Sequence, residues 1–435
     1  MARADRGVVF QHASIQSLLR ELGRNPALLE ICGFDPLPFQ AAPVRELHDG
    51  HAVTHPARVG STVPGHWNFS RFLGSVVRLE DERGLVSGMI GSLRSALFEE
   101  VPGFGRHLGQ DGKALASHWT GRVGEGKDNA SDPDADWGRH ETSGVNGRTG
   151  AIWKKVTSWF GYGLHLIADT HHEVPVAFAV TRASASEPGV LPGMLEESFG
   201  KMPRAERCAD FSADRGLDNA ARKKQLWDRW AIRPPIDTRL MWRVGKEEPD
   251  RDPEQPITRV LFPERTDVVV HDERGRVSCI CPATGEIRAM AFQGFEAGRG
   301  ACGTIEYRCP AAAFDLDCKG RGACHRAGGV KPGAYGRIVR VDLDKHDRRI
   351  FTPTPWSSPS WRRGYNRRSA MERINARLDR GFNFETHYIR GLARMKTRVG
   401  LALAVMMAMA LAHARAGRAE RMRSLVGAVP YRDTG

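Results

Sequence analysis

The chain has 435 residues, a formal net charge of +13 and eight cysteines. This length allows two or three domains around a large core, and the basic excess favours a polyanionic partner. No long apolar run follows the first residues, so we expect no signal peptide, and we expect reduced thiols or metal ligands in place of a disulfide framework. The longest apolar stretch, residues 399–412, is shorter than the roughly 20 residues of a membrane span and predicts a buried helix.

Residues 1–103 are expected to form a helical N-terminal domain. Apolar residues recur at helical spacing from Ile15 to Leu22, after Ser14 as a candidate N-cap. Further helices, separated by prolines, are predicted over residues 26–32, 67–77 and 85–98. Such a domain could bind DNA ends, but packing or dimerisation is an equal alternative because no recognition helix is evident.

An Asp-Gly pair marks the next segment, residues 104–117. We expect a strand that ends at Asp111, followed by a tight turn at Gly112, although Asp-Gly by itself is an ordinary turn. The polar, glycine-rich residues 119–150 predict a surface loop. The acidic cluster at 132–136 lacks the glycine and the distal glutamate of an EF-hand, so it is expected to be solvated.

Two apolar segments then form a candidate hairpin. Residues 159–169 predict a buried strand, and residues 173–181 predict its partner. His171 and His172 lie in the connecting turn. Because neither histidine has a partner at ligand spacing, we expect exposed turn residues there.

A second candidate carboxylate follows a short strand. The sequence predicts that this strand ends at Asp214, that Arg215 and Gly216 turn, and that a helix runs from about 219 to 230. A carboxylate at the C-terminal edge of a strand is well placed to bind a metal ion or a ligand. Residues 230–239 are expected to form the next strand.

Six of the eight cysteines gather in the region that follows, with one histidine beside them. They are Cys279, Cys281, Cys302, Cys309, Cys318 and Cys324, with His325 after the last. Thiolates and imidazole suit zinc, so this cluster could hold a structural zinc ion. The spacings do not form paired C-x-x-C knuckles, and buried free thiols are the alternative.

An arginine-rich segment, residues 361–380, is expected to form a helix after a proline-rich extended lead. Its apolar positions share one face, namely Met371, Ile374 and Leu378. Glu372 lies on a neighbouring face among arginines, where an acid usually only balances charge. Just upstream, residues 337–344 alternate in polarity and predict a strand that returns to the core.

Taken together, three of these stretches resemble the signature of the DDE transposases of bacterial insertion sequences, members of the RNase H-like superfamily. The first stretch holds Asp111, and the second has Asp214 within Ala-Asp-Arg-Gly. The third has the spacing Tyr-x-x-Arg-x-x-x-Glu, formed by Tyr365, Arg368 and Glu372. The resemblance covers roughly residues 105–240 and 335–415, with a looser likeness in the N-terminal helices.

The sequence departs from the family pattern at two positions. Leu217 stands where the family has an aromatic residue after Ala-Asp-Arg-Gly. Asp379 stands where the family has a lysine after the glutamate, with Arg377 and Arg380 beside it.

The resemblance implies that Asp111, Asp214 and Glu372 are the catalytic residues and the metal ligands. Three hard carboxylates suit two Mg²⁺ or Mn²⁺ ions, which can activate a water or a 3′-hydroxyl and stabilise the leaving oxygen. The residues expected to bind DNA phosphates are Tyr365, Arg368, Arg367, Arg377 and Arg380.

Asp169 is the competing candidate for the first aspartate, because it also ends a predicted strand. In the RNase H-like sheet that the resemblance implies, the first strand lies beside the strand that carries the second aspartate. We therefore expect Asp111 beside Asp214, within about 6 Å, and Asp169 away from them at a hairpin turn.

The predicted fold is mixed α/β, with an RNase H-like core interrupted by a mainly β, cysteine-rich insertion. Its expected parts are residues 1–103 (helical), 104–240 (first part of the core), 241–335 (insertion), 336–415 (second part of the core) and 416–435 (basic tail). The implied function is metal-dependent cleavage at element ends and transfer of the 3′-hydroxyl into target DNA. The implied protein is a homodimer on double-stranded DNA, cytoplasmic and nucleoid-associated in a bacterium, with no membrane partner. The alternatives are a related nuclease without strand transfer and an inactive DNA-binding remnant.

Overall fold

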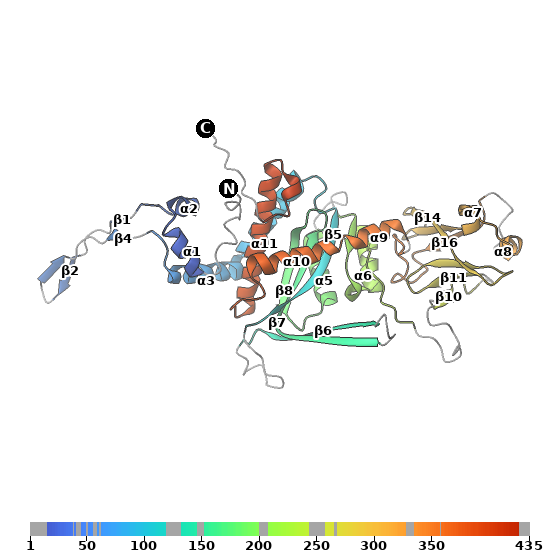
Figure 1. The fold of residues 1–435 in the computed structure, drawn as a ribbon, viewed down its shortest axis with the longest axis horizontal. Helices are drawn as coiled ribbons and strands as arrows, with labels where there is room; N and C mark the ends of the chain where they lie inside the picture. The colour runs from blue at the N-terminus through green and yellow to red at the C-terminus, as the bar shows by residue number, and fades with distance from the viewer. Residues whose placement is uncertain are drawn as a thin grey trace. The chain divides into compact units, whose positions relative to one another are not determined.

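The computed structural model describes residues 15–37, 39–40, 45–48, 51–54, 59–60, 62–118, 132–145, 152–199, 208–242, 257–264, 268–327, 335–356 and 358–425. The chain is mixed α/β, as predicted, with several sheets and many helices (Figure 1). It divides into two compact units, Met1–Ala96 with Arg377–Gly435, and Leu97–Ala376. The three carboxylates singled out by the sequence all belong to the second unit.

The N-terminal part of the first unit is helical where periodicity predicts helices. Its helices are α1 (Ile15–Leu22), α2 (Pro26–Ile31), α3 (His66–Arg83) and α4 (Leu85–Glu100), the last of which continues into the second unit. Asn25 caps α2, since its Oδ1 accepts a hydrogen bond from the Leu28 amide at 3.1 Å. Gly84 ends α3 with a φ of 62°, a left-handed conformation that glycine adopts without strain.

Short strands that the sequence analysis did not anticipate lie between α2 and α3. β1 (Phe39–Gln40) pairs with β4 (Val59–Gly60), and β2 (Arg45–His48) pairs with β3 (His51–Thr54), all antiparallel. Part of the proline-containing region between the two predicted helices therefore pairs as strands.

The long apolar stretch lies in α11 (Leu392–Arg415), which precedes a 3₁₀ turn, η6 (Ala419–Arg421). Among the described helices, α11 is the one long and apolar enough to cross a membrane, and 61% of its most apolar window is buried inside the protein. A buried core helix has this composition too, and the predicted burial of residues 399–412 agrees with it.

A mixed sheet forms the centre of the second unit (Figure 1). Its strands are β5 (His107–Ala116), β6 (Asp136–Val145), β7 (Ile152–Asp169), β8 (Val174–Arg182) and β9 (Asp210–Ser212). The first half of β7 pairs with β6, and its second half lies between β5 and β8, all antiparallel. β9 pairs with β5 in parallel. The predicted hairpin of residues 159–169 and 173–181 is therefore confirmed.

β5 continues through Asp111, so the predicted strand end and tight turn at this position are wrong. Gly109 and Gly112 are tolerated inside the strand because the side chains of other residues occupy the positions that a Cβ would take. A Cβ on Gly109 would lie 3.2 Å from Met371 Cγ, and a Cβ on Gly112 would overlap Glu187 Oε1.

The predicted surface loop at 119–150 is also wrong in part, because residues 136–145 form β6. Asp132, expected to be solvated, is fully buried, and its Oδ2 accepts a hydrogen bond from the Tyr162 hydroxyl at 2.7 Å. Residues 119–131 and 146–150 of that prediction lie outside the described part of the chain.

Helical segments flank β9. α5 (Glu187–Phe199) follows β8, and after β9 come η4 (Arg215–Leu217), α6 (Ala220–Lys224) and the π-helical turn η5 (Gln225–Arg229). The strand predicted over residues 230–239 is reduced to two parallel bridges, Asp210 with Arg233 and Ala213 with Ile236. Pro234 and Pro235 lack the N–H groups that a longer ladder would need.

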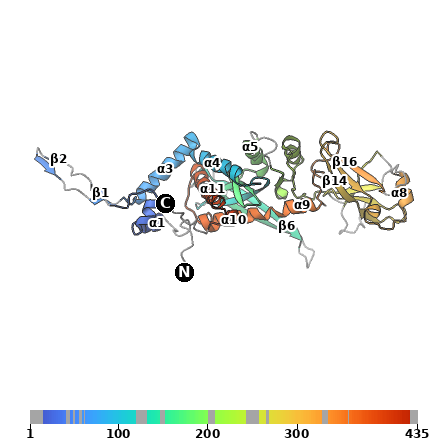
Figure 2. The same cartoon turned by 90° about the horizontal axis from the view of Figure 1, so that it is seen from above.

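The insertion holds two small antiparallel sheets. The first contains β10 (Thr258–Val260), β11 (Val269–Asp272), β12 (Val277–Ile280) and β13 (Ile287–Ala289), and the second contains β14 (Ala291–Glu296), β15 (Thr304–Arg308) and β16 (Ile338–Asp342). They share one apolar core, to which Val269, Val277, Ile305 and Val341 contribute. Two short helices, α7 (Pro310–Ala313) and α8 (Arg321–Ala327), accompany them, and Figure 2 shows α8 beside the strands.

The strand predicted over residues 337–344 is present as β16, but its predicted place is wrong. It pairs with β15 in the insertion and does not return to the central sheet. Its alternation arises because Val339 and Val341 point into the shared core of the insertion.

The arginine-rich segment forms two helices where the sequence predicts one. They are α9 (Pro359–Asn366), capped by Ser358, and α10 (Ser369–Phe382). The predicted apolar face is confirmed, since Met371, Ile374 and Leu378 are almost completely buried.

Candidate active site

Asp111 lies on β5, and Asp214 lies just after the parallel neighbour β9, at the equivalent position of the register. The register pairs His107 with Asp210 and Gly109 with Ser212. Asp111 lies two residues beyond the last pair on β5, and Asp214 lies two residues beyond it on the other chain segment. Parallel pairing therefore brings both side chains to one place, and the charge of Asp214 raises the pKa of Asp111.

Burial dominates the electrostatics of Asp111. It raises the pKa of the carboxyl group from 3.8 to about 6, opposed by the positive charge of Arg368 and assisted by Asp214 and Glu372. Asn375 Nδ2 donates a hydrogen bond to Asp111 Oδ2 at 3.0 Å. An aspartate that is half-protonated near pH 6 is unusual, and such perturbation is common at functional sites.

Glu187 is a further carboxylate that the sequence analysis did not identify. It is the first residue of α5, and its pKa is raised to about 7 by burial and by the charges of Asp214 and Asp111. Gly112 leaves space for its Oε1, and Gln110 forms a hydrogen bond with its side chain. No local sequence pattern marks this residue, because an acid in the first turn of a helix is ordinary.

The carboxylate of Asp214 is held by the turn that follows it. Its Oδ1 accepts a hydrogen bond from the Gly216 amide at 2.6 Å and so caps η4. A Cβ on Gly216 would lie 2.8 Å from this oxygen. The Ala-Asp-Arg-Gly motif therefore has a local structural role, which is to fix the Asp214 side chain.

α10 brings Glu372 and Asn375 toward β5, with Met371 packed at Gly109. The side chain of Glu372 is 64% exposed, and its Oε1 accepts a hydrogen bond from Arg368 Nη2 at 3.2 Å. Arg368 interacts electrostatically with Asp111 and Asp214 as well. It is therefore a positive charge shared by three acids of the site.

The donor set of this site fits a hard divalent cation, because Asp111, Asp214 and Glu187 bring oxygen ligands together in a partly buried place. Burial raises the pKa values of Asp111 and Glu187, and the charges of the neighbouring acids raise them further; a divalent cation would relieve that repulsion. Over the described ranges, no three His, Cys, Asp or Glu side chains already stand in an arrangement that holds a metal ion.

The other residues predicted to bind phosphate have varied surroundings. Tyr365 stacks on Trp361 with ring centroids 4.8 Å apart, and Arg368 lies 5.8 Å from the Tyr365 ring centroid. Arg367 is paired with Asp210 at 2.8 Å. The remaining two belong to the first unit, where Arg377 donates to the Arg423 carbonyl and Arg380 is exposed.

Asp169 lies at the end of β7, at the hairpin turn where the sequence places it. Its side chain is fully buried and accepts hydrogen bonds from the amides of Gly105 (2.6 Å), His171 (2.9 Å) and His172 (2.6 Å). This carboxylate holds two chain segments together through these hydrogen bonds. The His172 ring also contacts it at 3.1 Å, so the prediction of an exposed turn residue is wrong for His172.

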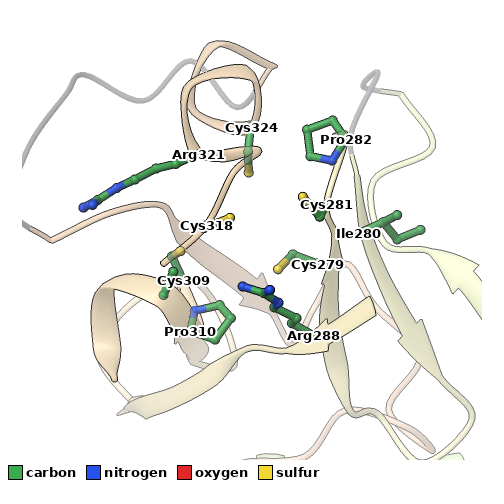
Figure 3. Close-up of a pocket in the computed structure, with 11 residues that line it drawn as sticks. Cys279, Ile280, Cys281, Pro282, Arg288, Cys309, Pro310, Cys318, Arg321 and Cys324 are labelled. Carbon is green, nitrogen blue, oxygen red and sulfur yellow. The ribbon is translucent and has the colours of Figure 1, made fainter. Parts of the chain in front are cut away.

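The cysteine cluster divides in the structure. Cys279, Cys281, Cys309, Cys318 and Cys324 line one pocket (Figure 3). Cys302 does not line it and packs against the apolar core of the insertion. The side chain of His325 lies outside the described part of the chain.

No known protein family, curated protein or solved structure matches this chain. The geometry of the acidic site and the sequence signature are therefore the grounds on which a function is proposed.

Proposed function

We propose that the protein is a DNA transposase that cleaves element ends and transfers the resulting 3′-hydroxyl into target DNA. The observation that carries the proposal is that Asp111 on β5 and Asp214, two residues after the parallel strand β9, lie at equivalent positions of the register and interact electrostatically. Glu372 reaches the same site from α10, and the three residues follow the order of the DDE signature.

The strand order supports an RNase H-like core as part of the proposal. β8, the second half of β7, β5 and β9 lie in sequence across the sheet, with the bridges to Arg233 and Ile236 beyond β9. Only β7 runs opposite to its neighbours in this set. A central first strand beside a parallel fourth is the arrangement that the resemblance implies.

The residues of the site would position a phosphodiester for in-line attack, without a covalent protein intermediate. Asp111, Asp214 and Glu372, joined by Glu187, would hold Mg²⁺ or Mn²⁺. When bound, these ions activate a water or a 3′-hydroxyl and stabilise the leaving oxygen. Arg368 would bind a DNA phosphate through paired hydrogen bonds while offsetting the negative charge of the acids.

Double-stranded DNA is the proposed partner, and a homodimer is the proposed assembly on it. The net charge of +13 favours binding to phosphates, which releases counterions and makes affinity depend on salt. The proposed location is accordingly the bacterial nucleoid.

A nicking assay tests the proposal directly. The purified full chain is incubated with a supercoiled plasmid carrying the DNA that flanks its coding sequence, with Mg²⁺, with Mn²⁺ or with EDTA. Metal-dependent nicks at fixed positions are expected, and the Asp214→Asn variant is expected to give none. Binding without nicking under every metal condition would favour the inactive remnant.

A joining assay separates transposase from nuclease. Pre-cleaved ends with free 3′-hydroxyls are offered together with target plasmid. Joined products are expected, because one acidic site serves both in-line steps. Cleavage without any joining would favour the nuclease.

A further inference from the structure

Five thiols from distant parts of the insertion converge on one pocket. Figure 3 shows the sulfur atoms of the five cysteines directed toward a common space, with Arg288 at its edge. The sulfurs come from three places in the chain: beside β12, after β15 and around the start of α8. Five cysteines meeting in one small pocket is an arrangement that simple core packing does not require.

The backbone around each of these thiols is fixed. Cys281 begins a turn in which its carbonyl accepts from the Gly285 amide at 2.8 Å. The Cys309 amide donates to the Arg337 carbonyl at 2.8 Å, and the Cys324 amide donates to the Gly320 carbonyl at 2.9 Å. The chain therefore presents its thiols from ordered positions.

Two of the sulfur atoms lie close to each other. Cys281 and Cys318 share a side-chain hydrogen bond. A Cβ on Gly320 would lie 2.6 Å from Cys281 Sγ, so only glycine allows the chain to pass this close to the thiol. Amides of Ala283, Thr284 and Gly320 form hydrogen bonds with the Cys281 side chain, as is favourable for a sulfur that carries negative charge.

We propose that Cys281, Cys309, Cys318 and Cys324 bind one structural zinc ion. Four cysteine sulfurs are a complete tetrahedral ligand set for a closed zinc site. The described thiols do not yet stand around a common point, so binding draws them together by side-chain rotation. The ion joins the sheet of β12 to the segment after β15 and to α8, and it stabilises an insertion whose strands are short.

Cys279 is excluded as a ligand although it lies within electrostatic range of Cys309, Cys318 and Cys324. It sits inside β12, paired with Val269 and Arg288, and it packs against the apolar core of the insertion. Its sulfur lacks the amide-rich turn that surrounds Cys281. We assign it to that core.

Arginines beside the pocket suit four thiolates and a zinc ion, which together form a dianion. Arg288 lies within electrostatic range of Cys281 and Cys318, and it donates to the Asp317 carbonyl at 3.1 Å. Arg337 is buried, and its Nη1 lies 3.9 Å from Cys324 Sγ. Such neighbours stabilise negatively charged zinc sites.

Metal analysis of the full-length protein tests the proposal. The protein is purified in reducing buffer without chelator, and bound zinc is measured by mass spectrometry. Close to one zinc per chain is expected. After exchange with Co²⁺, the intense visible bands of a tetrahedral cobalt–thiolate site are expected. Protein that stays folded and binds neither metal would overturn the proposal.

Thiol alkylation of the wild-type protein gives a test that does not depend on variants. Peptide mapping after brief labelling should show Cys281, Cys309, Cys318 and Cys324 protected, and labelled once a chelator is added. Cys32, which is exposed, reports free reactivity in both conditions. Protection that a chelator does not change, or disulfide-linked peptides among these four, would overturn the zinc site.

Serine variants identify the ligands. Cys281→Ser and Cys318→Ser are expected to lose most of the zinc. Cys279→Ser is expected to keep it, and so is Cys302→Ser, which lies outside the pocket. Loss of zinc from Cys279→Ser with retention in Cys281→Ser would overturn the assignment. The DNA-cleavage proposal does not depend on this result.

Discussion

Asn375 of α10 donates a hydrogen bond to Asp111 of β5 at 3.0 Å, across 264 residues of sequence. This contact and the packing of Met371 at Gly109 fasten α10 to the central strand. Glu372 lies less than one turn before Asn375 on α10, and Arg368 immediately precedes this helix, so the contact holds both residues near the aspartates. The insertion lies between β9 and α10 in sequence. The contact between α10 and β5 therefore brings Glu372 near Asp111 although the insertion separates them in the chain.

Neutral replacements of the three signature acids should abolish DNA cleavage. Asp111→Asn, Asp214→Asn and Glu372→Gln each remove a charge that the proposed metal ions need. Filter binding or gel shift should show DNA affinity little changed, because the acids repel phosphates and do not bind them. Full nicking activity in any one of the three would remove that residue from the mechanism.

Asp169→Asn should lower stability and leave DNA cleavage intact, unlike the three variants above. Its carboxylate is buried and accepts three amide hydrogen bonds, and an asparagine side chain has one acceptor oxygen and would present an N–H to an amide. We expect a loss of roughly 1–3 kcal/mol in the free energy of unfolding. Activity measured well below the melting temperature should be preserved. A stable but inactive variant would show that Asp169 takes part in the chemistry.

Much of the central sheet could be predicted from the sequence, because β7 and β8 are apolar and bounded by clear turn residues. Asp111 was found through its place in the signature, but its strand was predicted to end there. Glycines usually weaken strands, and the sequence alone does not show that Met371 and Glu187 fill the space beside Gly109 and Gly112.

Glu187 could not be found by pattern, since an acid at a helix start is ordinary and its burial depends on tertiary contacts. The place of β16 was mispredicted for a related reason. Alternation specifies a strand with one buried face, but it does not specify which sheet provides the partner. β16 pairs within the insertion because Val339 and Val341 pack against the apolar residues of the insertion.

The contribution of Asp111 and Glu187 to stability should fall as pH rises from about 4 to about 7, and it is measured as the difference between the wild type and variants of these two residues. Asp111 titrates at about 6 and Glu187 at about 7 in the folded protein, against ordinary values of 3.8 and 4.5. The folded state therefore binds more protons than the unfolded state between about pH 4 and pH 7, so their stabilising contribution is lost over that window. Melting temperatures measured without metal across this range test the expectation.

The Asp111→Asn variant provides the matched comparison. Its neutral amide avoids the repulsion with Asp214 and Glu187, so it should be more stable than wild type at pH 8, by roughly 1–2 kcal/mol after allowance for solvent screening. Added Mg²⁺ should narrow that difference by stabilising the wild type. Equal stability of the two proteins at pH 8 would contradict the electrostatic coupling.

Arg368→Ala should weaken DNA binding and reduce its salt dependence. The loss of one phosphate contact lowers the slope of log affinity against log salt by about 1. Because Arg368 also lowers the pKa of Asp111, the acid limb of the cleavage rate should shift to higher pH. Arg363→Ala, an exposed arginine on α9, serves as the control. An unchanged salt slope and pH profile would leave Arg368 with no role in the site.

Arg349→Ala should destabilise the second unit strongly. The guanidinium binds Asp218 at 3.0 Å and Glu273 at 2.6 Å, and Asp218 also accepts from Lys223 at 2.7 Å. Removal leaves buried carboxylates with less compensation, which costs about 3–5 kcal/mol for a broken buried pair. Urea unfolding followed by tryptophan fluorescence measures the change. Arg299→Ala, in an ion pair whose partners are about half exposed, should change stability by less than about 1 kcal/mol.

Gly112→Ala tests whether Glu187 belongs to the acidic site. The added methyl group would occupy the position of Glu187 Oε1, so the glutamate must move or the strand must shift, at a cost of roughly 1–3 kcal/mol. The control is Gly193→Ala on α5, the helix that carries Glu187. A Cβ at Gly193 meets no atom within 4 Å, and alanine stabilises a helix relative to glycine by up to about 1 kcal/mol. If Glu187 assists catalysis, Gly112→Ala and Glu187→Gln should lower nicking to similar extents and change its Mg²⁺ dependence, while Gly193→Ala stays active. A folded Gly112→Ala variant with wild-type nicking at every Mg²⁺ concentration would confine Glu187 to a structural role.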